Sequence, residues 1–242
     1  MKEAVKQGPV ILYGIGGVGK SALAREFVRR SKGEYDHILW LSCEKGLYSA
    51  ICDDTQIRIS NFRYSYEKYK SKAKYYREKM KKIKEIAGNT HLLLILDNFN
   101  ILQNTKIREV FALPCDILVT TRIQSLLWKD CQKVHVRGFQ AQERRELIRE
   151  CQKRISISEK MANELLNYGE RIQGHPLWML LKIRDAAKKG SLEINAEDIL
   201  GNLFSSLPLK NSGKQILREL SVMPAQGIPL DLYLQITKAD TE

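Results

Sequence analysis

The chain has 242 residues, 43% of them hydrophobic, which is enough for one large or two small globular domains. No apolar run approaches the roughly 20 residues that span a bilayer, and no basic-then-apolar leader opens the sequence. We therefore expect a soluble, cytoplasmic protein with no membrane partner. The five cysteines and four histidines lack metal-ligand spacing, which argues against a zinc site.

The formal net charge of +12 is concentrated in one segment. Residues 63–84 contain ten Lys or Arg and two Glu, so this segment alone holds +8 of the total. Whether the protein has an acidic partner depends mainly on these residues. Because a run of charge by itself seldom identifies a partner, a solvated face is the favoured interpretation.

Near the N-terminus, Gly14–Ser21 (GIGGVGKS) fits the pattern G-x-x-x-x-G-K-[ST] at every fixed position. A short apolar run at 10–13, predicted to be a strand, precedes it. Residues 21–30 follow, with apolar positions on one helical face. Strand, glycine loop and helix are the context in which this motif binds phosphate.

The residue types explain how such a loop would work. Glycines let backbone N–H groups surround phosphate oxygens, and the positive end of the following helix points at the same anion. Lys20 would place its charge on the outer phosphates, and the Ser21 hydroxyl would bind Mg²⁺. The predicted nucleotide-binding residues of this loop are Gly14, Gly16, Gly17, Val18, Gly19, Lys20, Ser21 and Ala22.

The first half of the chain alternates predicted strands with predicted helices, which is typical of a parallel α/β sheet. Further strands are predicted at 37–43, 91–96, 116–121 and 133–136, and a short helix at 47–52. The apolar run at 91–96 is unbroken, as expected of a strand buried on both faces. Ligands bind such sheets at the carboxyl ends of the strands.

A long helix is predicted over 64–87 and is expected to end at Gly88-Asn89. Its lysines are expected to face water. One apolar stripe runs along it, formed by Tyr66, Tyr69, Ala73, Tyr76, Met80, Ile83 and Ala87.

Three candidate catalytic residues follow the predicted strands. Asp97 ends a buried strand, where a Mg²⁺ ligand belongs, although a turn-forming Asp is the alternative. Asn98 can orient a water but cannot take its proton, and no other carboxylate is expected beside it, so hydrolysis would be slow at most. Arg122 could hold a terminal phosphate through two hydrogen bonds; a surface ion pair is an equal alternative for this residue alone.

After Gly138 the pattern changes to helices, predicted at 142–153, 158–172 and 176–189. Pro176 fits the first position of the last of these. His175 is expected to be exposed or to cap the helix, and the residues alone assign it no function.

Taken together, several stretches resemble the NB-ARC group of the STAND class of P-loop signal-transduction ATPases. They occur in the order typical of that family and extend over most of the chain. The stretches are GIGGVGKS (14–21), LLLILDN (92–98), ILVTTR (117–122), GHPLWML (174–180) and LRELSVMPAQGIPL (217–230).

This resemblance implies a P-loop nucleotide-binding domain at 1–137, a helical domain at 138–201 and the start of a winged-helix domain at 202–242. It also implies a switch within a longer protein that holds ADP and exchanges it for ATP with Mg²⁺. The ATP state would then self-associate and control a signalling or defence output. In such a switch, Arg122 would sense the terminal phosphate and Pro176 would pack on adenine.

Two features depart from the pattern of the family. Asn98 stands where a second Asp is commoner, and the sequence contains no Met-His-Asp motif. A different class remains open as the alternative: a nucleic-acid-acting P-loop ATPase, such as a loader or replication-type ATPase, that uses the basic helix 64–87. The ILVTTR and GHPL stretches favour the switch, so nucleic acid is the less favoured partner.

Overall fold

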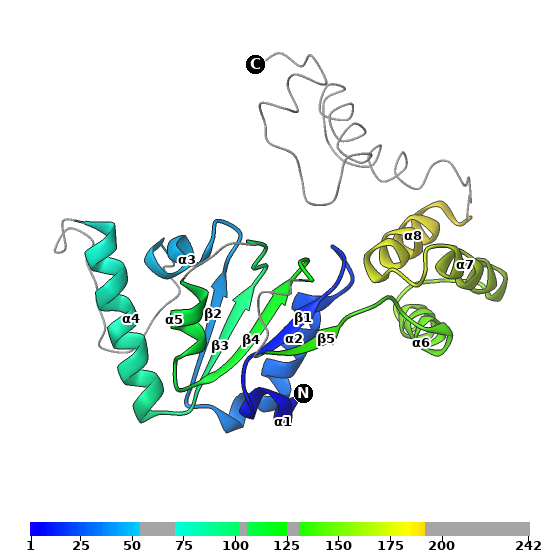
Figure 1. The fold of residues 1–242 in the computed structure, drawn as a ribbon. Helices are drawn as coiled ribbons and strands as arrows, with labels where there is room; N and C mark the ends of the chain where they lie inside the picture. Colours follow the sequence, from blue (N-terminus) through cyan, green and yellow to red (C-terminus); the bar gives the residue numbers. More distant parts are fainter. Residues whose placement is uncertain (54–70, 102–105, 125–130, 192–242) are drawn as a thin grey trace, which may run out of the picture. The chain divides into compact units, whose positions relative to one another are not determined.

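The computed structural model describes residues 1–53, 71–101, 106–124 and 131–191, arranged in two compact units (Figure 1). The first unit comprises Met1–Gln142 and Ile172–Trp178. The second contains Glu143–Arg171 and, among the described residues, 179–191. The predicted winged-helix segment 202–242 lies outside the described residues.

A parallel five-stranded sheet forms the centre of the first unit, as the alternating pattern predicts (Figure 1). Its spatial order is β2-β3-β4-β1-β5. Each strand lies within one residue of its predicted bounds. The strands are β1 (Val10–Tyr13), β2 (His37–Ser42), β3 (Leu92–Asp97), β4 (Asp116–Thr121) and β5 (Gln132–His135).

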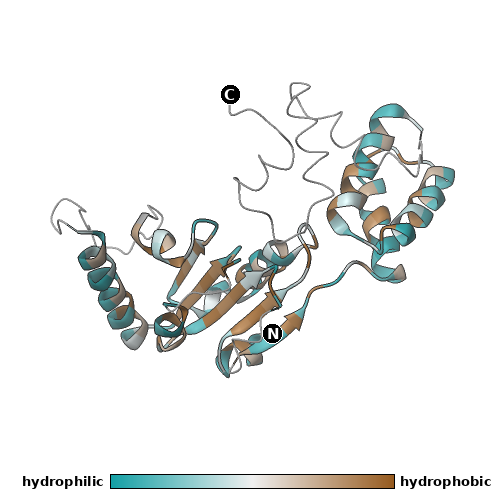
Figure 2. Cartoon of the chain, turned by 45° about the horizontal axis from the view of Figure 1, so that its top comes forward, coloured by the Kyte–Doolittle hydropathy of each residue, from teal (hydrophilic) through white to brown (hydrophobic). Residues whose placement is uncertain are grey.

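Successive residues of the central strands enter two separate cores, because side chains alternate across a sheet. On β3, Leu93 and Ile95 join a cluster with Val5 and Phe27. The intervening residues of β3 join a second cluster on the opposite face. Strands β1, β3 and β4 are accordingly apolar along most of their length, whereas β5 is exposed and largely polar. The helices carry polar outer faces (Figure 2). The unit is therefore a three-layer α/β/α structure.

Helices α1 (Lys2–Lys6) and α2 (Lys20–Ser31) cover one face of the sheet, and the 3₁₀ turn η1 (Lys32–Glu34) follows α2. The other face is covered by α3 (Leu47–Asp53), α4 (Lys72–Asn89) and α5 (Ile107–Phe111). The short helices α1 and α5 were not predicted, since five residues are too few to show a helical period.

Helix α4 differs from its prediction at both ends. Ser71 is extended, and its Oγ accepts a hydrogen bond from the Lys74 backbone N–H at 3.2 Å, so it is the N-cap. Residues 64–70 lie outside the described residues. The helix ends at Asn89, within the predicted Gly88-Asn89 pair, but the C-cap is the next residue, Thr90, which is extended and whose Oγ1 donates to the Ile86 carbonyl at 2.8 Å.

The apolar stripe of α4 also differs from the prediction. Ala73 is exposed and Tyr75 is buried instead, while Tyr76, Ile83 and Ala87 lie in the core as expected. The predicted members Tyr66 and Tyr69 lie outside the described residues. Within the described residues, the buried face of α4 therefore begins at Tyr75 and not at Ala73.

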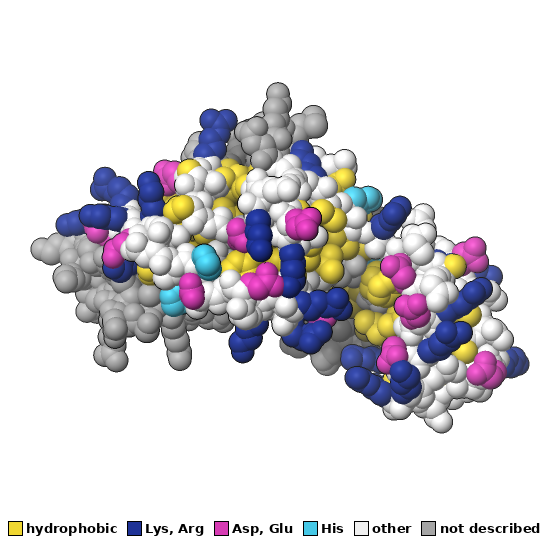
Figure 3. All heavy atoms as spheres, turned by 90° about the horizontal axis from the view of Figure 1, so that it is seen from below, with side chains coloured by type: hydrophobic (Ala, Val, Ile, Leu, Met, Phe, Trp, Pro, Cys, Tyr) yellow, Lys and Arg dark blue, Asp and Glu magenta, His cyan; other side chains and the backbone are white. Residues whose placement is uncertain are grey.

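One lysine of α4 does not face water. Lys79 is only 5% exposed, and its Nζ donates to the carbonyls of Ile51 at 2.7 Å and Cys52 at 3.3 Å. These carbonyls lie in the last turn of α3, where helical carbonyls lack intrahelical partners and carry partial negative charge. Lys79 thus satisfies the C-terminus of α3. Other Lys and Arg side chains gather on the surface at the end of the first unit that holds α4 (Figure 3).

The described part of the second unit is helical. It contains most of α6 (Ala141–Gln152) and α7 (Glu159–Arg171), and α8 (Pro176–Lys189) continues into it from the first unit. Ser158 caps α7 by accepting from the Met161 backbone N–H at 3.2 Å. None of the helices in the described residues is long and apolar enough to cross a membrane.

Candidate functional site

The carboxyl ends of three neighbouring strands bring the candidate residues together. Tyr13 of β1 pairs with Thr121 of β4, and Ser42 of β2 pairs with Asp97 of β3. The glycine loop after β1 therefore lies beside the residues that follow β3 and β4. This is the edge at which parallel sheets bind ligands.

The backbone of the loop requires glycine at two positions in particular. At Gly14 (φ +154°), a built Cβ would collide with the carbonyl oxygen of Val136. At Gly17 (φ +75°), a Cβ would lie 2.8 Å from Cε1 of His175. Of the other predicted loop residues, Val18 is buried and Ala22 is exposed in the first turn of α2.

Lys20 begins α2 directly behind this loop and is 9% exposed. Its Nζ donates to the carbonyls of Gly14 at 2.8 Å and Ile15 at 2.7 Å. Burial lowers the pKa of Lys20, the Arg122 cation lowers it further, and the Asp97 carboxylate raises it. The ammonium group is thus held at the mouth of the loop, where an anion would meet it.

Arg122 brings a second cation to the same place. Its guanidinium carbon lies 3.5 Å from the position that a Cβ on Gly16 would occupy, and the side chain is exposed. Two cations that converge beside loop amides and a helix N-terminus repel each other. An anion with several negative charges, such as a polyphosphate, would relieve that repulsion.

Asp97 is the acidic centre of the site. Its Oδ1 accepts hydrogen bonds from the Ser21 hydroxyl and the Thr120 hydroxyl, both at 2.6 Å. The backbone N–H of Asn98 in turn donates to the Thr120 Oγ1 at 2.9 Å. Ser21 and Asp97 therefore present two oxygen ligands side by side, and oxygen ligands are those that Mg²⁺ prefers.

The expectation that no second carboxylate lies beside Asn98 is wrong. Asn98 Nδ2 donates to Oε1 of Glu44 at 3.2 Å, and Glu44 follows β2. The Oδ1 of Asn98 accepts from Asn100 Nδ2 at 2.5 Å, and Asn100 Oδ1 accepts from the Arg122 backbone N–H at 2.7 Å. The residues after β2, β3 and β4 thus form one hydrogen-bonded chain.

His175 is buried rather than exposed, although the capping role predicted as an alternative is found. The carbonyl of Gly16 can only accept, so His175 Nε2 donates to it, at 2.8 Å. His175 Nδ1 then accepts from the Trp178 backbone N–H at 3.5 Å, at the start of α8. Pro176 is buried next to it and begins α8 as predicted. The entry to α8 therefore contacts the glycine loop.

Four residues of this site were not identified from the sequence: Glu44, Asn100, Thr120 and His175. Thr120 lies within the ILVTTR stretch, and the alternation along β4 could have placed its side chain opposite that of Val119. The contact of Glu44 depends on β2 being the neighbour of β3, which the sequence does not reveal. His175 required knowledge of a contact between residues 159 positions apart.

Residues 1–155 match the family model of the NB-ARC domain. The chain belongs to the NB-ARC family. This confirms the resemblance inferred from the sequence and makes the glycine loop part of a nucleotide-binding P-loop domain. No curated protein matches the chain.

Two solved DnaA structures resemble this NB-ARC chain in fold, and a third structure matches it at a lower TM-score. The replication initiator DnaA bound to AMPPCP and single-stranded DNA is 15% identical, with a TM-score of 0.54, covering 91% of this chain and 74% of that one. AMPPCP-bound DnaA from Aquifex aeolicus is 16% identical, with a TM-score of 0.51, covering 78% and 60%. A STAND protein with a tetratricopeptide repeat sensor from Pyrococcus horikoshii is 18% identical, with a TM-score of 0.47, covering 99% and 37%.

Proposed function

We propose that this NB-ARC chain is the core of a nucleotide-dependent switch that binds ADP or ATP with Mg²⁺ and hydrolyses ATP slowly at most. The observation that carries the proposal is the convergence of Lys20, Arg122 and the Ser21–Asp97 pair around the glycine loop. Two cations would bind the phosphates and two oxygens would bind their metal. The AMPPCP bound by the DnaA neighbours supports a triphosphate ligand.

Each residue has a distinct part in this proposal. Backbone N–H groups of the loop and the N-terminus of α2 would bind phosphate oxygens, with Lys20 and Arg122 neutralising their charge. Ser21 and Asp97 would hold Mg²⁺, which would complete its coordination with phosphate and water. Pro176 would pack against adenine.

The link from nucleotide to conformation would run through His175. Its hydrogen bond to the Gly16 carbonyl joins the glycine loop to the first turn of α8. A change in the loop on exchange of ADP for ATP would disturb that bond. We propose that this contact reports the nucleotide state to the helical segment and that self-association of a longer protein, with a signalling or defence output, follows from it. The domain boundaries at 137 and 201 belong to the same proposal.

The direct test is to identify the nucleotide that copurifies with the protein. Mass spectrometry of ligand released by denaturation should detect ADP, and calorimetry of the emptied protein should show binding of ADP and ATP that strengthens with Mg²⁺. Failure of the emptied, folded protein to bind either nucleotide would refute the proposal.

A second candidate is a nucleic-acid-acting ATPase, favoured by the exposed cations of α4. Lys74, Arg77, Lys81 and Lys84 are all exposed on this helix. One fold neighbour was solved with single-stranded DNA. Binding by charge should weaken steeply with salt, because each neutralised phosphate releases a counterion. DNA binding that persists at moderate salt and is lost when Lys74, Lys81 and Lys84 become Ser would favour this candidate over the switch.

A further inference from the structure

The pair formed by Glu44 and Asn98 lies at the carboxyl edge of the sheet, on two adjacent strands. Ser42, the last residue of β2, pairs with Asp97, the last residue of β3. The Cys43 backbone N–H then donates to the Asp97 carbonyl at 2.7 Å, which extends the pairing one residue further. The backbone pairing of β2 with β3 therefore places Glu44 beside Asn98. A turn closed by the Gly46 N–H on the Cys43 carbonyl, at 2.9 Å, follows.

Hydrogen bonds fix both the backbone and the side chain of Asn98. Its backbone is left-handed (φ 59°), a conformation that asparagine tolerates better than most residues. The backbone N–H is held by Thr120 and the side-chain Oδ1 accepts from Asn100. With Oδ1 occupied as an acceptor, the amide Nδ2 donates to the Glu44 carboxylate at 3.2 Å. This hydrogen bond fixes the orientation of the two side chains relative to each other.

Hydrolysis of ATP needs a group that can take a proton from the attacking water. Asp97 is poorly suited, because its Oδ1 already accepts from Ser21 and Thr120 and the same carboxylate would face the metal. Among the described residues, Glu44 is the second carboxylate that hydrogen bonds place at this edge, and it is exposed, so water reaches it.

We propose that Glu44 is the general base for ATP hydrolysis in this chain and that Asn98 is its positioning residue. This rests on the proposed function, in which ATP is the substrate. The Glu44 carboxylate takes one proton from a water molecule as the water oxygen forms a bond to the γ-phosphorus. The bond from that phosphorus to the β,γ-bridging oxygen breaks, and its electron pair leaves with ADP, giving ADP and inorganic phosphate. An exposed base in an open site keeps the rate low, because water screens its electrostatic effect.

The test compares Glu44→Gln with the wild type in single-turnover ATP hydrolysis, with ADP and ATP affinities measured separately by calorimetry. Removing a general base should slow hydrolysis by about 100-fold or more. Both affinities should stay within about threefold, because Glu44 does not contact the loop residues that hold phosphate. Glu3→Gln is the matched control, an exposed glutamate on α1 at the opposite edge of the sheet, and it should hydrolyse ATP at the wild-type rate.

The role of Asn98 is tested by Asn98→Gly, which keeps the left-handed backbone accessible. Its kcat should fall by about tenfold with KM unchanged. In the Glu44→Gln background the same change should have no further effect, because the oriented carboxylate is already gone. Equal melting temperatures will show that each variant is folded.

Two results would overturn the assignment while leaving the switch in place. One is a Glu44→Gln protein that hydrolyses ATP at the wild-type rate. The other is a wild type that binds ATP but shows no hydrolysis at all in a single turnover. A folded wild type that binds no adenine nucleotide would instead remove both the base and the proposed function.

Discussion

Lys20 and Lys79 are both buried, and each donates to two backbone carbonyls, yet their surroundings differ. Lys20 lies at the sheet edge with Arg122 and Asp97 close enough to shift its pKa. Lys79 lies between α3 and α4, and its two acceptors, Ile51 and Cys52, belong to the end of a helix. The same hydrogen-bonding pattern therefore holds an ammonium group at the proposed nucleotide site in one region and satisfies a helix C-terminus in the other. The two lysines differ in whether other charged side chains lie nearby and in whether an anion could reach the ammonium group.

The largest expected effect comes from removing the ammonium group at the sheet edge. Lys20→Ala should weaken ADP binding by about 100-fold or more, because a charged hydrogen bond contributes about 1.5–3 kcal/mol and more than one phosphate oxygen is involved. Calorimetry measures the affinity, and circular dichroism should show an unchanged fold. Unchanged ADP affinity in a folded Lys20→Ala protein would remove Lys20 from the site.

The opposite outcome is expected for the other lysine. Lys79→Met keeps an apolar stem of similar length but leaves the Ile51 and Cys52 carbonyls without their donor. Unfolding free energy should fall by about 1–3 kcal/mol, which is the usual cost of buried polar groups left unpaired. ADP affinity of the folded protein should not change. Chemical denaturation measures the loss, and Lys81→Met, exposed on the same helix, is the control with little effect.

A Lys79→Met protein that is fully stable but binds ADP poorly would reverse the comparison, since Lys79 would then act on the ligand and not on α3.

These two lysines also show which features could be predicted from the sequence. The glycine-loop pattern is local, so Lys20, Ser21 and the glycines could be predicted as loop residues from one stretch of sequence. The five strands could be predicted from their apolar runs. Lys79 sits in a run of lysines that reads as a solvated face, and nothing local distinguishes it from Lys81. Its burial follows from how α4 packs on α3, which is a tertiary property.

The same distinction between local patterns and tertiary packing explains which other site residues were predicted. Asp97 and Arg122 follow recognisable strands, so the rule that parallel sheets bind ligands at their carboxyl edge placed them correctly near the loop. Glu44 was missed because the local sequence pattern does not reveal the strand order, in which β2 lies next to β3. His175 was missed because its partner is the backbone carbonyl of Gly16, and any residue has one.

A smaller effect is expected at the contact between the loop and α8. His175→Ala removes the hydrogen bond from Nε2 to the Gly16 carbonyl, together with the cap that Nδ1 gives to the Trp178 N–H, and only the first of these reaches the glycine loop. Since a neutral hydrogen bond contributes about 1 kcal/mol, ADP affinity should fall by up to about tenfold. His91→Ala is the control, because that side chain is exposed near the start of β3. A 100-fold loss with His175→Ala would place this residue on the nucleotide, alongside Lys20.

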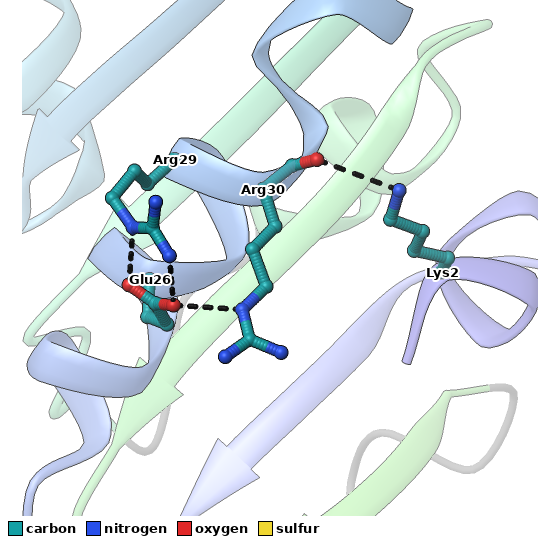
Figure 4. Close-up of polar contacts among 4 residues, drawn as sticks. All are labelled: Lys2, Glu26, Arg29 and Arg30. Carbon is teal, nitrogen blue, oxygen red and sulfur yellow. Dashed lines mark hydrogen bonds and ion pairs between the residues drawn. The ribbon is translucent and has the colours of Figure 1, made fainter.

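The smallest effect is expected for a charged pair at the surface, and it sharpens the contrast with both buried lysines. On α2, Glu26 accepts two hydrogen bonds from Arg29 and one from Arg30, each at 2.7 Å (Figure 4). Hydrogen bonds from Arg29 and then Arg30 lower the pKa of Glu26 from its ordinary 4.5 to about 2. This pKa is depressed in the folded state, so the pairing stabilises the fold above about pH 4.5 and is lost as the pH falls through about 2.

Exposure nevertheless keeps this contribution small, because solvent screens the pair and its long side chains lose entropy when ordered. Glu26→Gln should therefore lower the melting temperature at pH 7 by no more than about 2 °C. The difference from the wild type should shrink as the pH is lowered from 7 toward 3, because below about pH 4.5 the unfolded wild type takes up a proton at Glu26 that the folded, paired carboxylate does not. A difference that grows on acidification would contradict the sign of the shift. A loss of stability in Glu26→Gln as large as that expected for Lys79→Met would also contradict the comparison. It would show that exposure to solvent does not separate the weak surface pair from the buried lysines.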